Sequence, residues 1–184
     1  MQTEKKTSSR ALPHLDDFLL NLQTNNYSDK TIYNYERDLI VFQKFIEEVG
    51  LPFSKVDKRL INRYKAYLHS IDRRTAKHKK TTGKLTSFST NRLLSSLRSY
   101  LRYLIEMGLP CPIAPESVKL VKQERKHPRV PELNDLIRLI EAPSELEKNT
   151  LIATRNRAML EVLFSTGMRI SELLSLNRSQ IDES

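Results

Sequence analysis

Several residue types are scarce in this sequence of 184 residues, and each scarcity narrows the class of protein. A single cysteine, Cys111, excludes a framework of disulfide bonds. Four glycines and the lack of an alternating apolar pattern argue against a β-rich fold. No apolar run approaches the roughly 18 residues of a membrane helix, and no signal-peptide pattern is present. We therefore expect a cytoplasmic protein with no membrane partner.

Acidic residues are scarce in the middle third of the chain. The whole sequence carries 31 Lys or Arg against 22 Asp or Glu, which gives a net charge of +9 and a pI of about 9.7. Residues 73–129 hold 14 of the basic residues and only three of the acidic ones. Such a run of like charge needs counterions or phosphates to relieve its repulsion. A polyanion is therefore the expected partner.

Apolar residues recur at three- and four-residue steps over most of the chain, which predicts an all-α fold. After a polar segment at 1–11 that we expect to be disordered, four helices are predicted. They lie at about 15–22, between the N-cap Ser28 and Gly50, from Asp57 to about 71, and from about Ser89 to Gly108. Four helices of this length form a bundle, so residues 12–108 are predicted to be one domain.

The chain after this bundle changes in composition. Four of the eight prolines fall at positions 110, 112, 115 and 128, among several lysines and arginines, which predicts an extended basic linker over residues 109–130. A second helical unit is expected over 131–184. Its apolar stripes, which include Leu136, Ile140, Leu163 and Leu173, have too few partners in so short a segment. We expect them to stay partly uncovered.

A single arginine, Arg169, follows a glycine that is expected to end a helix, Gly167. Its planar guanidinium can bind two phosphate oxygens at once and stays charged at any working pH. Glu172 lies three residues on, where it can reach Arg169 on the same helical face. Taken alone, this pattern predicts a helical hairpin with one phosphate clamp and no active site.

The run from Thr166 to Leu176, Thr-Gly-Met-Arg-Ile-Ser-Glu-Leu-Leu-Ser-Leu, resembles the first arginine box of the tyrosine recombinases, the phage integrase and Xer-like family. Residues 89–104 and 131–140 resemble that family's last core-binding helix and first catalytic-domain helix. Five further residues resemble the motif that opens the family's core-binding domain: Ser28, Thr31, Tyr35, Leu39 and Phe42. The resemblance spans roughly residues 12–182. It implies a four-helix SAM-like core-binding bundle, a basic linker and the first helices of an incomplete catalytic domain.

The resemblance also implies a chemistry. Members of the family cleave a DNA strand by attack of a tyrosine on the scissile phosphate, then rejoin it through the phosphotyrosine, without a metal or cofactor. By this likeness Arg169 contacts the scissile phosphate and Glu172 orients Arg169. The family's hairpin lysine, His-x-x-Arg box and nucleophilic tyrosine follow the first arginine, and none of them has a counterpart here. Every tyrosine of this sequence lies at or before Tyr103. We expect this chain to be inactive in cleavage by itself.

The predicted DNA contacts are polar or basic side chains of the two long helices, of the basic loop and of the linker. A helix with one apolar face and one arginine and serine face suits a DNA groove or backbone. The candidates are Lys30, Thr31, Asn34, Arg73, Arg74, Lys77, Lys79, Lys80, Lys84, Arg92, Ser95, Arg98, Arg102, Lys119, Lys122, Arg125 and Lys126.

The leading hypothesis is a portion of a site-specific tyrosine recombinase or integrase that binds duplex DNA at a recombination site. We expect it to be a monomer off DNA and to meet further recombinase protomers on DNA in the full-length protein. Two alternatives stay open. One is a standalone, catalytically inactive DNA-binding regulator or decoy of a recombinase. The other is a helical scaffold whose basic segment binds an acidic protein partner.

Overall fold

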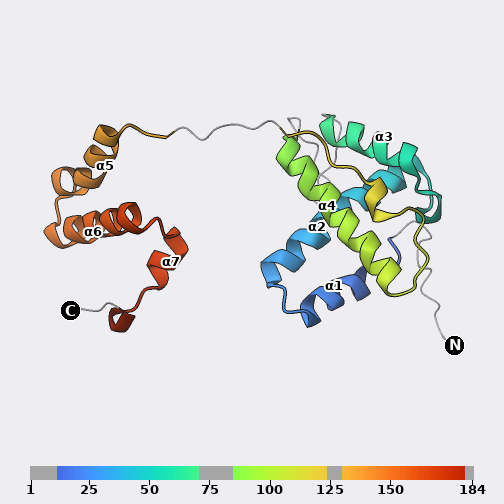
Figure 1. Cartoon of the computed structure of the whole chain (residues 1–184), viewed down its shortest axis with the longest axis horizontal. Helices are drawn as coiled ribbons and strands as arrows, with labels where there is room; N and C mark the ends of the chain where they lie inside the picture. Colours follow the sequence, from blue (N-terminus) through green and yellow to red (C-terminus); the bar gives the residue numbers. More distant parts are fainter. Residues whose placement is uncertain (1–11, 71–84, 124–129, 181–184) are drawn as a thin grey trace. The chain divides into compact units, whose positions relative to one another are not determined.

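The structure, a computed structural model, describes residues 12–70, 85–123 and 130–180, and all regular elements in these ranges are helical (Figure 1). The all-α prediction is confirmed. The chain divides into two compact units between residues 125 and 126, and each is considered by itself. The segment expected to be disordered, 1–11, lies outside the described residues, as does the basic loop at 71–84.

Four α-helices form the first unit, as predicted. They are α1 (Leu15–Thr24), α2 (Asp29–Val49), α3 (Lys58–His69) and α4 (Ser87–Glu106), with short 3-10 turns η1 (Phe53–Lys55) and η2 (Pro115–Ser117). Helix α4 crosses α2 and also contacts α1, α3 and η2 (Figure 1). It is therefore the helix around which the unit is assembled.

The core of this unit is a continuous cluster of aliphatic and aromatic side chains. Fully buried members include Leu39, Phe42 and Ile46 of α2, Tyr64 and Leu68 of α3, and Leu97, Tyr100, Leu101 and Leu104 of α4. The ring of Phe18 lies edge-on to Tyr100, with 5.7 Å between the ring centroids. The Tyr100 hydroxyl donates a hydrogen bond to the Pro13 carbonyl, and burial raises its pKa. Tyr64 and Tyr100 are therefore core residues of this unit.

Helix ends follow the expected local signals. The hydroxyl of Ser28 accepts a hydrogen bond from the Thr31 amide at 3.3 Å, and the carboxylate of Asp57 accepts one from the Leu60 amide at 2.7 Å. Gly50 ends α2 in the left-handed region at φ 73°, where a residue without Cβ carries no steric cost. Helix α4 begins slightly earlier than expected, because Thr86 caps it by accepting from the Ser89 amide.

Residues 109–123, the first part of the predicted extended basic linker, pack on the first unit. Ile113 and Val118 are buried in its core, whereas Lys119 and Lys122 face solvent. The Asn91 amide fixes this segment from α4: it donates to the Val121 carbonyl at 2.9 Å and accepts from the Val121 amide at 2.8 Å. Pro115 begins the short 3-10 turn η2 within this packed segment.

The second unit contains α5 (Leu133–Leu146), α6 (Thr150–Thr166) and α7 (Ile170–Ser175), with α5 packed against α6. Among its described residues only Ala153 is buried. The predicted apolar stripes are indeed only half covered, and several large side chains such as Leu151 and Leu174 are exposed. Within the three described ranges, no helix combines the length and the apolar character needed to cross a membrane.

The Asn91 contact generates a prediction about stability. Replacing Asn91 with Ala removes both hydrogen bonds to Val121, so we expect the free energy of unfolding to fall by about 1 to 3 kcal/mol. The Val121 amide should also exchange its hydrogen much faster. Denaturant titration and hydrogen exchange measure the two effects, with Ser95→Ala on the exposed side of α4 as the control. Unchanged exchange at Val121 would contradict the role of Asn91.

Candidate nucleic-acid interface

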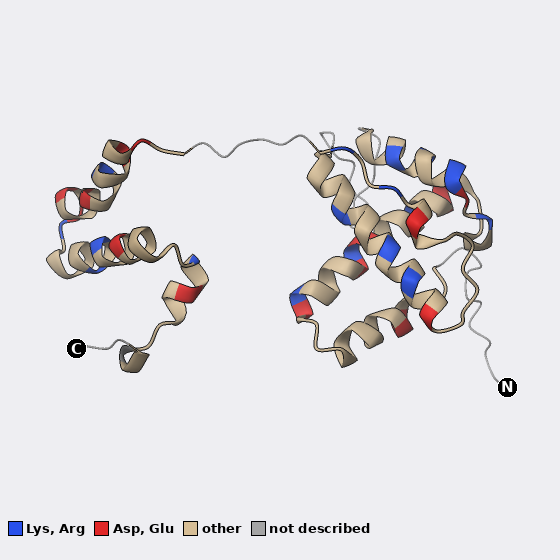
Figure 2. Cartoon of the chain, viewed as in Figure 1, with Lys and Arg blue, Asp and Glu red and all other residues tan. Residues whose placement is uncertain are grey.

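Helix α4 divides into an apolar and a cationic face, as the sequence indicates. Its predicted apolar residues, Leu93, Leu97, Tyr100, Leu101 and Leu104, are all buried. The basic residues of α4 are Arg92 and Arg102, which are exposed, and Arg98, which is half buried. Figure 2 colours the basic positions along this helix blue. Because the apolar face is fixed in the core, the opposite face is presented to solvent in one orientation.

The candidate DNA contacts on α4 differ in exposure. Ser95 and Arg102 are exposed, with no hydrogen bond or ion pair from either side chain in the described part of the chain. Arg98 is half buried, and its Nε atom is inaccessible to solvent without a hydrogen-bond partner in the described residues. Of these two arginines, Arg102 is therefore the more exposed candidate.

Arg92 has a partner that the sequence interpretation missed. Its Nη1 atom lies 2.8 Å from each carboxylate oxygen of Asp38 on α2. The Ser96 hydroxyl donates to the same carboxylate at 2.9 Å. Burial raises the pKa of Asp38, and the neighbouring Arg92 guanidinium opposes that rise. The only signal in the sequence was an acid at position 38, inside the stripe that runs from Tyr35 through Leu39 to Phe42.

In the sequence, the remaining candidates lie at the start of α2, between α3 and α4, and after α4. Lys30 is exposed, and Asn34 is half buried. The Thr31 hydroxyl is already within 2.9 Å of the Ser28 hydroxyl in the helix cap. Lys119 and Lys122 are exposed on the packed segment that Asn91 holds. Eight candidates lie outside the described residues and stay predictions: Arg73, Arg74, Lys77, Lys79, Lys80, Lys84, Arg125 and Lys126.

Arg169 and Glu172 form one local contact in the second unit. Gly167 ends α6 at φ 67°, and α7 begins directly after Arg169. One carboxylate oxygen of Glu172 accepts from the Arg169 backbone amide at 2.7 Å, and the other accepts from its guanidinium at 2.8 Å. These two hydrogen bonds, the backbone one first, lower the pKa of Glu172. The Arg169 side chain is 82% exposed, so its other donors face solvent.

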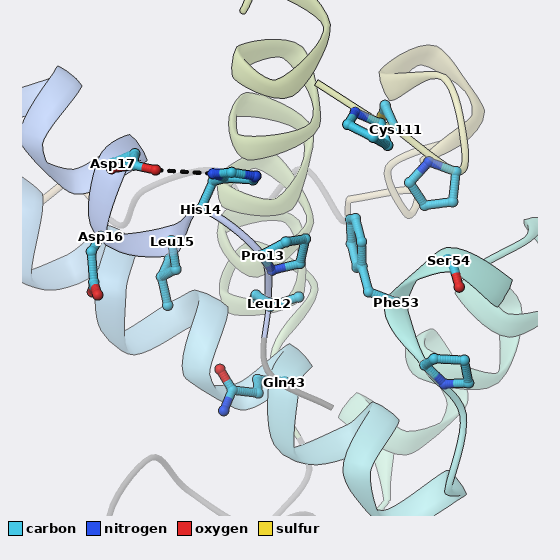
Figure 3. A pocket seen from close by; sticks show the side chains of 13 residues that line it. Leu12, Pro13, His14, Leu15, Asp16, Asp17, Gln43, Phe53, Ser54 and Cys111 are labelled. Carbon is cyan, nitrogen blue, oxygen red and sulfur yellow. Dashed lines mark hydrogen bonds and ion pairs between the residues drawn. The ribbon is translucent and has the colours of Figure 1, made fainter. Parts of the chain in front are cut away.

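A surface hollow of the first unit lies apart from these candidates. Leu12, Gln43, Phe53 and Cys111 border it, and the one polar contact drawn there joins His14 Nδ1 to Asp17 at 3.0 Å (Figure 3). The Cys111 thiol is directed to the backbone carbonyl of Ile113 at 3.2 Å. Across the described ranges, no three His, Cys, Asp or Glu residues gather as a metal site would require. We assign no catalytic role to this hollow.

Comparison with known proteins agrees with the two-unit division. The family model of the phage integrase N-terminal SAM-like domain matches residues 15–108, and that of the phage integrase family matches residues 131–184. The chain belongs to the phage integrase family. Its first unit thus contains the SAM-like domain of this family, and its second unit matches the phage integrase family model.

Similar phage integrase family members include Xer recombinases of several bacteria. The chain is 38% identical to tyrosine recombinase XerC of Pediococcus pentosaceus over 158 residues, which are 85% of this chain and 48% of the relative. It is 30% identical to XerD of Oceanobacillus iheyensis over 84% of this chain and 47% of that protein. It is 31% identical to XerC of Staphylococcus aureus over 92% of this chain and 52% of that protein.

The chain therefore spans about half the length of these relatives. No solved structure matches it.

The contact between Arg169 and Glu172 predicts a titration. Replacing Arg169 with Ala removes the guanidinium and keeps the backbone amide, so the lowered pKa of Glu172 should rise part of the way to its ordinary value. The sign follows from linkage: a lowered pKa stabilises the start of α7 above the ordinary carboxyl pKa, and this is lost as the pH falls through the lowered value. Carboxyl ¹³C shifts followed against pH measure the pKa.

Arg155→Ala, an exposed arginine of α6, is the matched control and should leave the pKa of Glu172 unchanged. An ordinary pKa for Glu172 in the unaltered chain, or the same value in Arg169→Ala, would contradict the contact.

Proposed function

We propose that the chain binds duplex DNA at a recombination site, as the core-binding part of a site-specific tyrosine recombinase. The observation that carries this proposal is the cationic face of α4 in a phage integrase SAM-like domain. Arg92, Arg98 and Arg102 share that face, and Lys119 and Lys122 extend the charge along the segment packed beside it. Arginine and lysine contacts to phosphates position a protein on DNA without reading its sequence.

The second unit supplies the first part of the reaction centre in this proposal. Attack on a phosphodiester gives a transition state with excess negative charge on phosphorus oxygens, which a fixed cation stabilises better than water does. Arg169 is the cation, and Glu172 holds it by the bonds at 2.7 and 2.8 Å. The proposed partners are further recombinase protomers on DNA. We propose that the free chain is a monomer. Its cytoplasmic location stays a prediction.

The alternatives make different demands on the molecule. A standalone regulator or decoy needs residues 131–184 to fold stably, yet Ala153 alone is buried among the described residues of that unit. A scaffold for an acidic protein uses the same cationic face, but membership of the phage integrase family favours DNA. Competition between duplex DNA and an acidic protein for the same face separates these two readings.

Salt dependence tests the proposed DNA binding directly. If about six cationic side chains engage phosphates, log affinity against log salt should have a slope of about −5 on mixed-sequence duplex DNA. Arg102→Gln should reduce the steepness by about 0.9, because one contact is lost. Lys148→Gln, an exposed lysine between α5 and α6, is the control and should leave the slope unchanged. Fluorescence anisotropy over a salt series measures this, and a slope near zero would refute DNA binding.

Strand cleavage by this chain alone is expected to be absent. Every tyrosine lies in the first unit, and most are packed in its core, so none is placed after Arg169 as the family's nucleophile is. On a nicked suicide duplex we expect no covalent complex under denaturing electrophoresis, with a complete tyrosine recombinase on its own site as the positive control. A covalent band would overturn this expectation, and Tyr27→Phe and Tyr33→Phe, at the two exposed tyrosines, would then identify the nucleophile.

A further inference from the structure

An acidic side chain lies beside the cationic face of α4, where it opposes the attraction of DNA. Asp38 is almost fully buried, with a side chain that is 2% exposed, while its partner Arg92 is 47% exposed. A carboxylate at a surface that binds a polyanion lowers the positive potential there. Burying a charge is also costly unless it is well paired. The position of Asp38 therefore calls for a compensating role.

The geometry of the pair leaves part of Arg92 available. Its Nη1 atom lies 2.8 Å from both oxygens of Asp38. In the described part of the chain, Nε and Nη2 of Arg92 have no hydrogen-bond partner. A guanidinium is planar and carries its five N–H donors in a fixed fork, so fixing one nitrogen also orients the others. Arg92 can thus pair with Asp38 and still offer donors to an anion from solvent.

The carboxylate is itself held in place. The Ser96 hydroxyl, one turn after Arg92 on α4, donates to Asp38 at 2.9 Å. Asp38 sits on α2 beside Leu39, which is fully buried, so its backbone cannot shift without disturbing the core. A buried support of this kind removes rotamer freedom from Arg92 before DNA arrives, and binding then loses less entropy.

We propose that Asp38 is a positioning residue for DNA binding, which holds the Arg92 guanidinium so that its remaining donors meet a backbone phosphate of the duplex. The inference rests on the proposed DNA binding and assigns to a negatively charged residue a favourable effect on it. A purely structural Asp38 would affect folding stability alone. A purely electrostatic Asp38 would weaken DNA binding through its charge. The three accounts therefore predict different changes in DNA affinity when the charge of Asp38 is removed: weaker binding for a positioning residue, no change for a structural one and tighter binding for an electrostatic one.

Asp38→Asn is the test, because it removes the charge and nearly keeps the shape. We expect binding of mixed-sequence duplex DNA to weaken about fivefold and the salt slope to become less steep by about 0.9, as for the loss of one charge-assisted phosphate contact. Glu36→Gln, at an exposed acid of the same helix, should bind as tightly as the unaltered chain or more tightly. Ser96→Ala removes one hydrogen bond to Asp38 and should weaken DNA binding by less than Asp38→Asn does.

A second substitution tests whether Asp38 acts through Arg92. In an Arg92→Gln background, Asp38→Asn should cause no further loss of affinity, because the residue that it positions is gone. Circular dichroism at the assay temperature establishes that each variant is folded, and Asp38→Ala replaces Asp38→Asn if the latter is not.

Equal or tighter binding by the folded Asp38 variant would overturn the inference, as would an equal loss in the Arg92→Gln background. Failure of the unaltered chain to bind DNA with a steep salt slope would instead refute the proposed function, and the inference with it.

Discussion

The burial of one face of α4 is the constraint on which the rest of the first unit depends. Leu97, Leu101 and Leu104 are essentially inaccessible to solvent, and each buried leucine contributes about 1.5 to 3 kcal/mol. Since α4 contacts α1, α2, α3 and η2, these leucines hold several elements in one arrangement. The same packing turns Arg92 and Arg102 outward, so the position of the candidate DNA surface is a consequence of the core.

Two of the arginine–carboxylate pairs in the described residues, Arg169–Glu172 and Arg92–Asp38, illustrate different ways to orient a cation. Arg169 and Glu172 are three residues apart, and their contact forms within the first turn of α7. Both are largely exposed, so the pair is screened by water and contributes little to stability. Arg92 and Asp38 are 54 residues apart, and the carboxylate is buried. That pair exists only when α2 and α4 are packed, and breaking it leaves a buried charge unpaired.

The second unit depends more on local helix signals and less on a buried core than the first unit does. Its helices form from local signals, with Asn149 capping α6 and Gly167 ending it, yet its apolar side chains stay mostly in contact with solvent. Arg169 is therefore oriented by its own helix before any surrounding pocket contributes. The chain spans about half the length of its Xer relatives.

The local sequence determined the helices and their ends, because both rest on interactions within a few residues. It also indicated the family. The Ser28 and Asp57 caps and the glycine ends at 50 and 167 bond within one turn, and apolar spacing alone predicted the face of α4 that is buried. The resemblance carried by Thr166–Leu176 indicated the phage integrase family. Net charge indicated a polyanion, but it counted every cation alike.

Only the tertiary structure decided which basic side chains are paired with a carboxylate and which segments pack on the bundle. Nothing within a few residues of Asp38 indicates Arg92, because their meeting depends on how α2 crosses α4. The prolines after residue 108 predicted an extended basic linker and gave no sign that it packs on the bundle. Ile113 and Val118 are nevertheless buried there, and Asn91 binds Val121 from 30 residues away. Such contacts are set by the packing of distant elements, for which local spacing carries no signal.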